Sequence, residues 1–248
     1  MCLCIVVLFF SFSSRSVSRL IDGISISCPF TCPSCYSPPS RDQYIICVLF
    51  LRSTYSNNPA KAIDGWDNVI HTARKLIRFA QILEIPVLAT EQNPKALGPT
   101  DPSLDLESLS PEQFLGCFPK TKFSMVIPET MQIIQERKIS NIILVGIESH
   151  ICILQTALEL LAARFAAQPI EVYVLADGVS SCHPQEVPVA LARLAKAGAM
   201  VTTSESILFQ LQADAARPTF KSFAKQVKEE KDGTRRALDG LAKNSSRL

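Results

Sequence analysis

The feature that most constrains the fold is a regular alternation of short apolar runs and helix-periodic segments from Tyr44 onward. Residues 44–51 (YIICVLFL) form a continuous apolar run, as expected of a strand buried on both faces of a parallel sheet. Residues 67–83 then place apolar side chains at helical spacing. The alternation continues to residue 212 and predicts an α/β fold with a mostly parallel sheet and helices on both faces.

The pattern predicts strands at 44–51, 85–89, 141–146, 170–175 and 199–202, and helices at 67–83, 129–138, 151–163, 185–197 and 204–212. Gly198 is expected to end the fourth helix, and Ser204 is expected to be the N-cap of the fifth. Residues 91–119 contain five prolines and are expected to form a long loop over a functional site, because long loops in compact domains usually carry function.

Composition divides the chain into three parts. Residues 1–43 are rich in Cys, Pro and Ser and are expected to be a non-globular segment. Residues 44–220 carry the α/β pattern, and residues 221–248 form a charged C-terminal tail. The tail is expected to be a solvated helix followed by disordered chain, because its charges alternate in sign and its last twenty residues lack aromatics.

The N-terminal part allows more than one interpretation. The spacing Cys28-x3-Cys32-x2-Cys35 suggests zinc ligands, but the absence of a nearby His or fourth ligand favours an irregular linker. Residues 2–12 form an apolar run shorter than the roughly 20 residues of a membrane helix, and no basic residue precedes it as in a secretory signal. We therefore expect a cytoplasmic protein without a membrane partner; secretory or organellar targeting is the alternative.

Charge and motifs argue against several kinds of ligand. The formal net charge is +2, which gives no reason to expect a basic surface for nucleic acid. No glycine-rich phosphate fingerprint follows a predicted strand, so we expect no dinucleotide cofactor. The chain has only three histidines, so a metal site has little support.

A cysteine stands where chemistry is expected. In parallel α/β sheets ligands bind beyond the carboxyl ends of the strands, and residues 146–152 (GIESHIC) run from such an end into a helix. A thiol in the first turn of a helix feels the positive end of the helix dipole, which favours the thiolate. Cys152 is therefore a candidate nucleophile, although its position alone also fits a buried packing residue.

Four segments resemble the isochorismatase-like cysteine hydrolases, and in particular the eukaryotic isochorismatase domain-containing proteins. They are residues 88–100 (LATEQNPKALGPT), 119–125 (PKTKFSM), 142–156 (IILVGIESHICILQT) and 175–181 (LADGVSS). The likeness covers roughly residues 48–230. It implies a three-layer αβα, Rossmann-like fold, a Cys–Asp–Lys catalytic triad that works without a cofactor, and assembly into homo-oligomers.

The resemblance also implies roles for individual residues. Cys152 matches the nucleophile, and Lys120 matches the lysine whose ammonium keeps the thiolate charged. The family has a non-proline cis peptide that falls at Ile147–Glu148 in this chain. Its oxyanion hole corresponds to the backbone N–H groups of Ile151 and Cys152.

The aspartate of the triad is missing from the expected position. The family pattern Leu-Phe-x-x-Asp-x-Gln aligns with residues 49–55 (LFLRSTY), which places Ser53 where the aspartate should be. Serine cannot act as a general base near neutral pH, and losing that role typically costs roughly 10²–10⁴-fold in rate. Two explanations stay open: a chain that keeps the pocket without its aspartate, or a sequence that is wrongly assembled before about Asn58.

Three more residues are candidates for substrate binding. Glu91 and Gln92 follow a predicted strand, and His150 lies two residues before Cys152; each of them also fits a loop anchor or a solvent-facing residue. The loop after the second strand lacks the histidines of the family's metal-binding nicotinamidases, so no metal ligand is assigned. We predict a hydrolase that acts on a small amide-type or related molecule through a thioester and is impaired by Ser53. The alternative is an inactive relative that binds a small molecule or forms an oligomer.

Overall fold

The computed structural model describes residues 40–50, 62–163 and 170–242 of the 248-residue chain. The cysteine-rich segment before residue 40, Ser53 and the end of the tail after residue 242 lie outside the described residues. Within the described ranges no helix is both long and apolar enough to cross a membrane.

The strands are β1 (Tyr44–Phe50), β2 (Val87–Gln92), β3 (Phe114–Lys120), β4 (Asn141–Ile147), β5 (Glu171–Ser180) and β6 (Met200–Thr202). The helices are α2 (Trp66–Leu83), α3 (Pro94–Leu97), α4 (Pro128–Glu136), α5 (Leu154–Ala163), α6 (Glu186–Ala197), α7 (Ser204–Gln212) and α8 (Phe220–Ala237). Short turns of tighter or wider helix are η1 (Arg41–Gln43), η2 (Pro102–Leu104), η3 (Leu106–Ser108), η4 (Ser149–Ile153) and η5 (Leu238–Ala242).

The six strands form one sheet in the order β3-β2-β1-β4-β5-β6, and every neighbouring pair is parallel. The strand order reverses between β1 and β4, which pair directly from Tyr44 opposite Asn141 to Leu49 opposite Gly146. In sheets of this kind the ligand site lies beyond the carboxyl ends of the two strands at this reversal. The sheet topology therefore directs the search for a site to the end of β4, where Cys152 follows.

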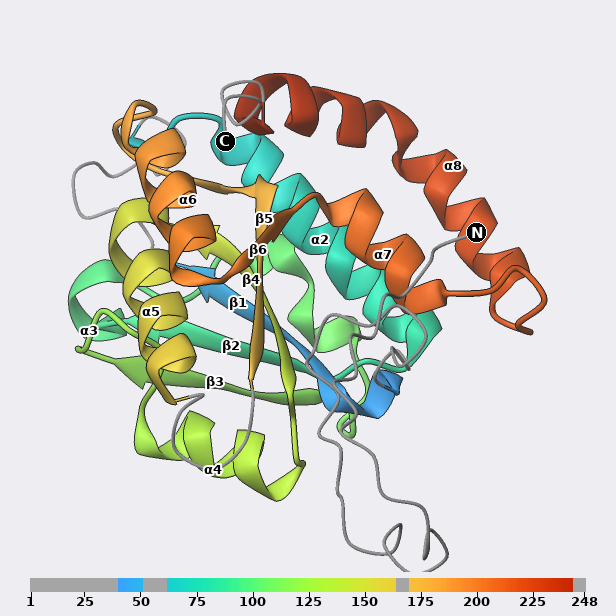
Figure 1. The fold of residues 1–248 in the computed structure, drawn as a ribbon, viewed down its shortest axis with the longest axis horizontal. Coiled ribbons are helices and arrows are strands. Elements are labelled where there is room, and N and C mark those ends of the chain that lie inside the picture. The colour runs from blue at the N-terminus through green and yellow to red at the C-terminus, as the bar shows by residue number, and fades with distance from the viewer. Residues whose placement is uncertain (1–39, 51–61, 164–169, 243–248) are drawn as a thin grey trace, which may run out of the picture. The chain divides into compact units, whose positions relative to one another are not determined.

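Helices cover both faces of the sheet and confirm the predicted three-layer α/β fold (Figure 1). Helices α2, α7 and α8 lie on one face, and α4, α5 and α6 lie on the other (Figure 1). Strand β1 shows why its sequence is apolar throughout: Ile46 and Val48 belong to the core under α2, whereas Ile45 and Cys47 belong to the opposite core. Successive side chains of a strand point to opposite faces, so a central strand needs apolar residues at every position.

Two local predictions are wrong. Residues 114–120, which were expected to belong to a long loop, form strand β3, which pairs only with β2 at the edge of the sheet. An edge strand tolerates Pro119 because its missing N–H removes no bond from a central ladder. The N-cap of α7 is Thr203, whose side chain accepts a hydrogen bond from the Ser206 N–H, and not Ser204.

The charged segment after residue 220 also differs from expectation, because its helix is not simply solvated. Helix α8 runs along α2 (Figure 1) and buries one face against it. Phe223 is fully buried, with its ring 5.0 Å from that of Phe79 on α2. At Gly233 the two helices approach so closely that an added Cβ would lie 2.0 Å from the ring of His71. The alternating charges in the sequence of α8 therefore mask the residues of this helix that pack against the core.

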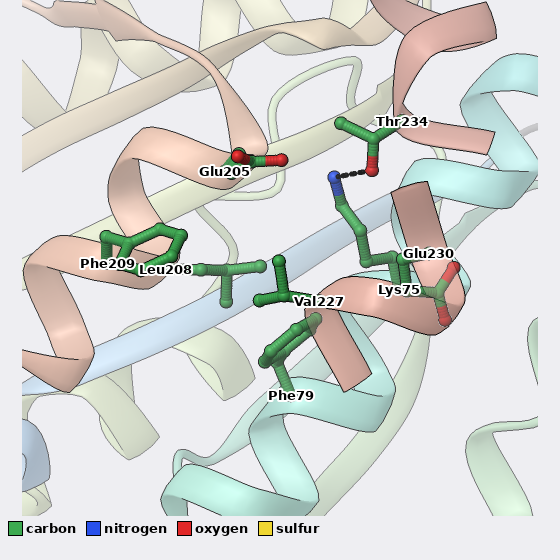
Figure 2. Close-up of a pocket in the computed structure, with 8 residues that line it drawn as sticks. All are labelled: Lys75, Phe79, Glu205, Leu208, Phe209, Val227, Glu230 and Thr234. Atoms are coloured by element: carbon green, nitrogen blue, oxygen red, sulfur yellow. Dashed lines mark hydrogen bonds between the residues drawn. The ribbon is translucent and has the colours of Figure 1, made fainter. Parts of the chain in front are cut away.

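The seam between α2, α7 and α8 encloses a lysine (Figure 2). Lys75 is 2% exposed and donates a hydrogen bond of 2.9 Å to Thr234 Oγ1. Burial lowers the pKa of Lys75, and the carboxylates of Asp177, Glu205 and Glu230 oppose that shift. The residues around Lys75 leave a cavity of about 10 Å³, room for a single water molecule. This lysine is therefore a packed structural group, whose counter-charges are carboxylates.

Candidate active site

The site forms around Lys120, the last residue of β3. Its Nζ donates hydrogen bonds to Gln92 Oε1 at 2.6 Å and to the carbonyl oxygens of Lys122 at 3.0 Å and Phe123 at 2.8 Å. These three oxygens match the three protons of an ammonium group. The Cys152 Sγ lies 4.0 Å from the same nitrogen, and only 6% of Lys120 is exposed. The lysine thus holds a buried positive charge beside the thiol.

Among the residues that the structure describes, no carboxylate forms an ion pair with the buried Lys120. Burial lowers its pKa, and the charge on Cys152, when the thiol ionises, raises it. Since its other partners are neutral oxygens, the group that can neutralise this ammonium is the thiolate itself. The arrangement favours ionisation of Cys152 more than a carboxylate-paired lysine could.

Cys152 lies in η4, a π-helical turn between β4 and α5, where the Ile153 N–H reaches back to the Glu148 carbonyl at 3.2 Å. This turn begins at Ser149, two residues before the predicted helix. Burial raises the pKa of the Cys152 thiol, while Lys120 and a hydrogen bond from the Glu148 N–H lower it. Burial therefore opposes the dipole-favoured thiolate expected from the sequence, because the desolvation of a 1% exposed thiol raises its pKa overall.

The backbone next to the nucleophile matches one prediction and adds a detail to another. The peptide bond Ile147–Glu148 is cis, as the resemblance implied. The N–H of Ile151, a candidate donor to an oxyanion, makes a bond of 3.2 Å to the Glu148 carbonyl. The roles of Ile151 and Cys152 as oxyanion donors stay a prediction.

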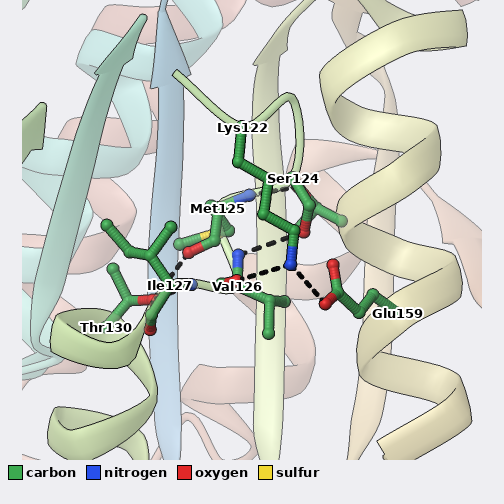
Figure 3. A network of polar contacts seen from close by, with 8 residues as sticks. Lys122, Ser124, Met125, Val126, Ile127, Thr130 and Glu159 are labelled. Carbon is green, nitrogen blue, oxygen red and sulfur yellow. Dashed lines mark hydrogen bonds and ion pairs between the residues drawn. The ribbon is translucent and has the colours of Figure 1, made fainter. Parts of the chain in front are cut away.

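The loop after β3 holds the two carbonyl groups that accept hydrogen bonds from Lys120, those of Lys122 and Phe123. Figure 3 shows how Lys122 and the residues that follow it are anchored. Lys122 Nζ bridges this loop to α5, since it donates to Glu159 Oε1 at 2.5 Å and to the Val126 carbonyl at 2.9 Å. Ser124 Oγ accepts the Val126 N–H at 3.0 Å. Lys122 is thus a loop anchor, and its backbone carbonyl is part of the Lys120 environment.

The same loop is tied to α4 and α5 by two threonines. Thr156 Oγ1 on α5 accepts the Met125 N–H at 2.9 Å. Thr130 Oγ1 on α4 donates to the Met125 carbonyl at 2.6 Å and accepts the Ile127 N–H at 3.2 Å. The residues between β3 and α4 are therefore held from both sides (Figure 3), which orients the carbonyls that bind the ammonium.

The two candidates at the end of β2 have different places in the structure. Glu91 Oε2 accepts hydrogen bonds from the N–H of Thr100 at 2.8 Å and from its hydroxyl at 3.0 Å, so Glu91 anchors the loop after α3. Gln92 receives the Lys120 ammonium on its oxygen and donates from its nitrogen to the Thr121 carbonyl at 2.5 Å. Gln92 therefore orients Lys120, a role that the sequence alone did not suggest.

A polar cluster joins the ends of β4 and β5. The Glu148 carboxylate accepts hydrogen bonds from the Cys182 N–H at 2.9 Å and from Ser181 Oγ at 3.1 Å. His150 Nδ1 lies 2.9 Å from the same Ser181 hydroxyl. His150 was a candidate from the sequence, whereas Glu148 and Ser181 were not, because residues 33 positions apart meet only where β4 and β5 pair.

The remaining expectations concern residues away from Cys152 or outside the described ranges. Ser53, at the position of the family aspartate, lies outside the described residues. Asp177 is fully buried and accepts hydrogen bonds from the N–H and hydroxyl of Ser204, so it anchors the start of α7. Among the described residues, no group of three or more His, Cys, Asp or Glu side chains is placed to hold a metal ion.

Fold and site together define a cysteine-centred α/β protein, and comparison with known proteins gives its family. The isochorismatase domain profile matches residues 46–206. The chain belongs to the isochorismatase domain family. It is 42% identical over 168 residues to isochorismatase domain-containing protein 1 of Danio rerio. That alignment covers 67% of this chain and 56% of the fish protein, so the match spans a little over half of the relative's length.

Two solved structures show the same fold. The structure of MAR1 ribonuclease from Caenorhabditis elegans superposes with a TM-score of 0.67 and 37% identity, covering 77% of this chain and 92% of that one. The YcaC gene product of Escherichia coli, an octameric hydrolase of unknown specificity, superposes with a TM-score of 0.59 over 86% of this chain and 95% of its own. Its identity to this chain is 13%, so it supports the fold alone.

Proposed function

We propose that the chain is a cysteine hydrolase that attacks a small amide-type or related substrate with Cys152 and proceeds through a thioester. The observation that carries the proposal is the 4.0 Å approach of the Lys120 ammonium to the Cys152 thiol, with both groups buried. The pair lies at the carboxyl ends of β3 and β4, beside the reversal of strand order where α/β sheets bind ligands.

The proposed reaction has two stages, formation of a thioester on Cys152 and hydrolysis of that thioester. The Cys152 thiol loses its proton, and the thiolate forms a bond to the substrate carbonyl carbon while Lys120 balances the negative charge. The C–N bond breaks, and the amine leaves with the proton that the thiol gave up. Water then attacks the thioester carbon, which releases the carboxylic acid and returns a proton to the sulfur.

Removal of the proton from the Cys152 thiol is the step for which this chain lacks the family's general base. Burial keeps the Cys152 thiol protonated at neutral pH, so the attack needs a base near the sulfur. The resemblance places that base at residue 53, where this chain has serine. We therefore propose a turnover that is slower than in a relative with aspartate by roughly 10²–10⁴-fold.

Restoring the carboxylate tests the proposal. We expect Ser53→Asp to raise ammonia release from a panel of small primary amides by at least roughly 100-fold. Adding Cys152→Ala to that variant should abolish the gain. Ser56→Asp is the matched control, because it adds the same charge three residues away and should leave the rate unchanged.

A second function has its own supporting observation, since no carboxylate occurs from Gln43 to Ile63. A relative without the base can retain the pocket and bind a small molecule without turning it over. If Ser53→Asp folds normally and releases no ammonia from any amide, the hydrolase proposal fails and the binding function is preferred.

Assembly into homo-oligomers is also proposed, on the basis of exposed apolar side chains. Phe123, beside Lys120, is 52% exposed, and Val189 on α6 is 64% exposed. Light scattering on the purified chain should give a mass of at least two copies, and a mass of 27.3 kDa would contradict the proposal.

A further inference from the structure

In the polar cluster of Glu148, His150 and Ser181, the Ser181 hydroxyl determines which groups donate hydrogen bonds and which accept them. Three groups lie within 3.2 Å of the Ser181 hydroxyl oxygen: the Glu148 carboxylate at 3.1 Å, His150 Nδ1 at 2.9 Å and the His183 N–H at 3.2 Å. Cys182 Sγ lies farther away, at 4.0 Å, and is a weaker acceptor than the carboxylate. A serine hydroxyl has one proton to donate and two lone pairs to accept with. All three contacts can be satisfied only if one neighbour accepts and two donate.

Glu148 is the neighbour that accepts. Burial raises the pKa of its carboxyl group, but hydrogen bonds from Cys182 and Ser181 outweigh burial and lower the pKa overall. An ionised carboxylate has no proton to donate, and a hydrogen bond to it is stronger than one to a neutral nitrogen. The Ser181 proton therefore points to Glu148.

The direction of that proton sets the tautomer of His150. Because the Ser181 hydroxyl is already used as a donor, His150 Nδ1 must donate to its oxygen. A neutral imidazole carries one proton, so Nε2 keeps a free lone pair. Within the described ranges Nε2 has no hydrogen-bond partner, and the side chain is only half-buried. An acceptor is thus available two residues before the nucleophile, in the same π-helical turn.

We propose that Glu148 and Ser181 hold His150 as a hydrogen-bond acceptor for an N–H group of the substrate, so that the site prefers primary amides to the corresponding esters. The inference rests on the proposed role of Cys152 as nucleophile. Glu148 and Ser181 are positioning residues, whereas His150 contacts the substrate. Glu148 also joins this cluster to the nucleophile, because its carbonyl accepts the N–H groups of Ile151 and Ile153, which flank Cys152, at 3.2 Å each.

The tautomer can be measured without any substrate. Long-range proton–nitrogen correlation spectra of the ¹⁵N-labelled full chain near pH 8 report which ring nitrogen carries the proton in each of the three histidines. We expect His150 to be protonated on Nδ1 and free on Nε2. A proton on Nε2 with a bare Nδ1 would overturn the proposal.

Two variants test whether the cluster causes this state. Ser181→Ala removes the acceptor of the Nδ1 proton. Glu148→Gln replaces the carboxylate, which can only accept a hydrogen bond from the Ser181 hydroxyl, with an amide that can also donate one to it. Both should shift His150 toward the Nε2-protonated form. The exposed Ser206→Ala variant is the control, and the signals of His71 on α2 should stay fixed throughout. Unchanged His150 signals in both folded variants would contradict the assignment.

The preference for an N–H group can be tested with two electrophiles of similar shape. Acrylamide carries the N–H donors and methyl acrylate does not, so their relative rates of Cys152 alkylation, divided by the same ratio for glutathione, measure recognition of the amide. We expect a preference of about tenfold, the value of one hydrogen bond. His150→Phe should abolish it, and His150→Gln, which keeps an acceptor, should restore part of it.

The outcomes separate this inference from the proposed function. A ratio that His150→Phe leaves unchanged would overturn the amide preference while leaving Cys152 as the nucleophile. If Cys152 reacts with neither electrophile, the proposed function fails, and the amide preference fails with it. The ring signals of His150 would still decide whether Glu148 and Ser181 set its tautomer.

Discussion

Two buried lysines face very different surroundings. Lys75 and Lys120 are 2% and 6% exposed, and burial lowers the pKa of each. Carboxylates supply the opposing charge around Lys75, whereas Lys120 faces three neutral oxygens and a thiol. A permanent counter-charge makes a buried ammonium a structural element. A counter-charge that appears only when a thiol ionises makes it part of a reactive site.

The largest expected effect is on the stability of the Lys75 region. Lys75→Met removes the cation beside Asp177 and Glu230, although Arg78 still pairs with Glu230 at 2.6 Å, and we expect the free energy of unfolding to fall by about 3 kcal/mol. Lys120→Met leaves only neutral partners behind and should change it by less than about 1 kcal/mol. Urea denaturation of both variants measures the difference. Equal losses would show that the two lysines are alike.

A second substitution adds a methyl group where α2 and α8 pack together and leaves the charges there unchanged. Gly233→Ala should lower the free energy of unfolding by about 2 kcal/mol, because the new methyl group would overlap the His71 ring. Helix propensity alone predicts the opposite sign. Removing the ring as well, with His71→Ala, should recover part of the loss in urea denaturation. A stabilised Gly233→Ala protein would show that α8 does not pack on α2 this closely.

The third expectation concerns reactivity. Because Lys120 lowers the pKa of Cys152 and Lys75 does not act on it, Lys120→Met should slow alkylation of Cys152 by iodoacetamide about tenfold at pH 8. Mass spectrometry after timed exposure gives the rate, and Lys75→Met is the matched control. A slowed Lys75→Met protein would break the contrast between the two lysines.

The pH dependence of the same reaction follows from burial. Because the pKa of Cys152 lies above its ordinary 9.0, the alkylation rate should still rise above pH 9.0, as the thiol gives up its proton. Lys120→Met should move this rise to higher pH. A plateau below pH 8 in the wild-type chain would contradict the inference that burial dominates.

The smallest effect is expected in the loop that surrounds Lys120. Lys122→Met breaks an ion pair whose side chains are 49% and 38% exposed, so the free energy of unfolding should fall by at most about 0.5 kcal/mol. Cys152 alkylation should slow about twofold as the carbonyls lose their orientation. Lys225→Met, which breaks an exposed pair on α8, is the control and should leave the reaction unchanged. A tenfold slowing in Lys122→Met would mean that this loop, and not burial, sets the reactivity.

Periodicity in the sequence predicted five of the six strands and the helices between them, because each buries a continuous apolar face. Strand β3 was not predicted, because Gly116 and Pro119 interrupt its apolar pattern. Such an interruption is tolerated only in an edge strand, and β3 lies at the edge of the sheet. Helix α8 was found, but its packing was not, since alternating charges on its exposed side conceal Phe223 and Gly233.

The site was predictable only where its residues lie in recognisable motifs. Cys152 and Lys120 were found through such motifs, and the structure brings them together. Gln92, Glu148 and Ser181 act through contacts between strands that are distant in sequence, so no local pattern reveals their roles. The thiol's resting protonation depends on desolvation, which appears only once the chain is packed.

The packing of α8 changes where this domain can be divided. The family profile ends at residue 206, yet Thr234 supplies the hydrogen bond to Lys75 and Phe223 completes the core beside Phe79. A shortened chain that stopped near residue 212 would expose both an unpartnered ammonium and an aromatic cluster. The smallest unit able to fold by itself therefore includes α8, and the boundary of sequence similarity is not a boundary of autonomous folding.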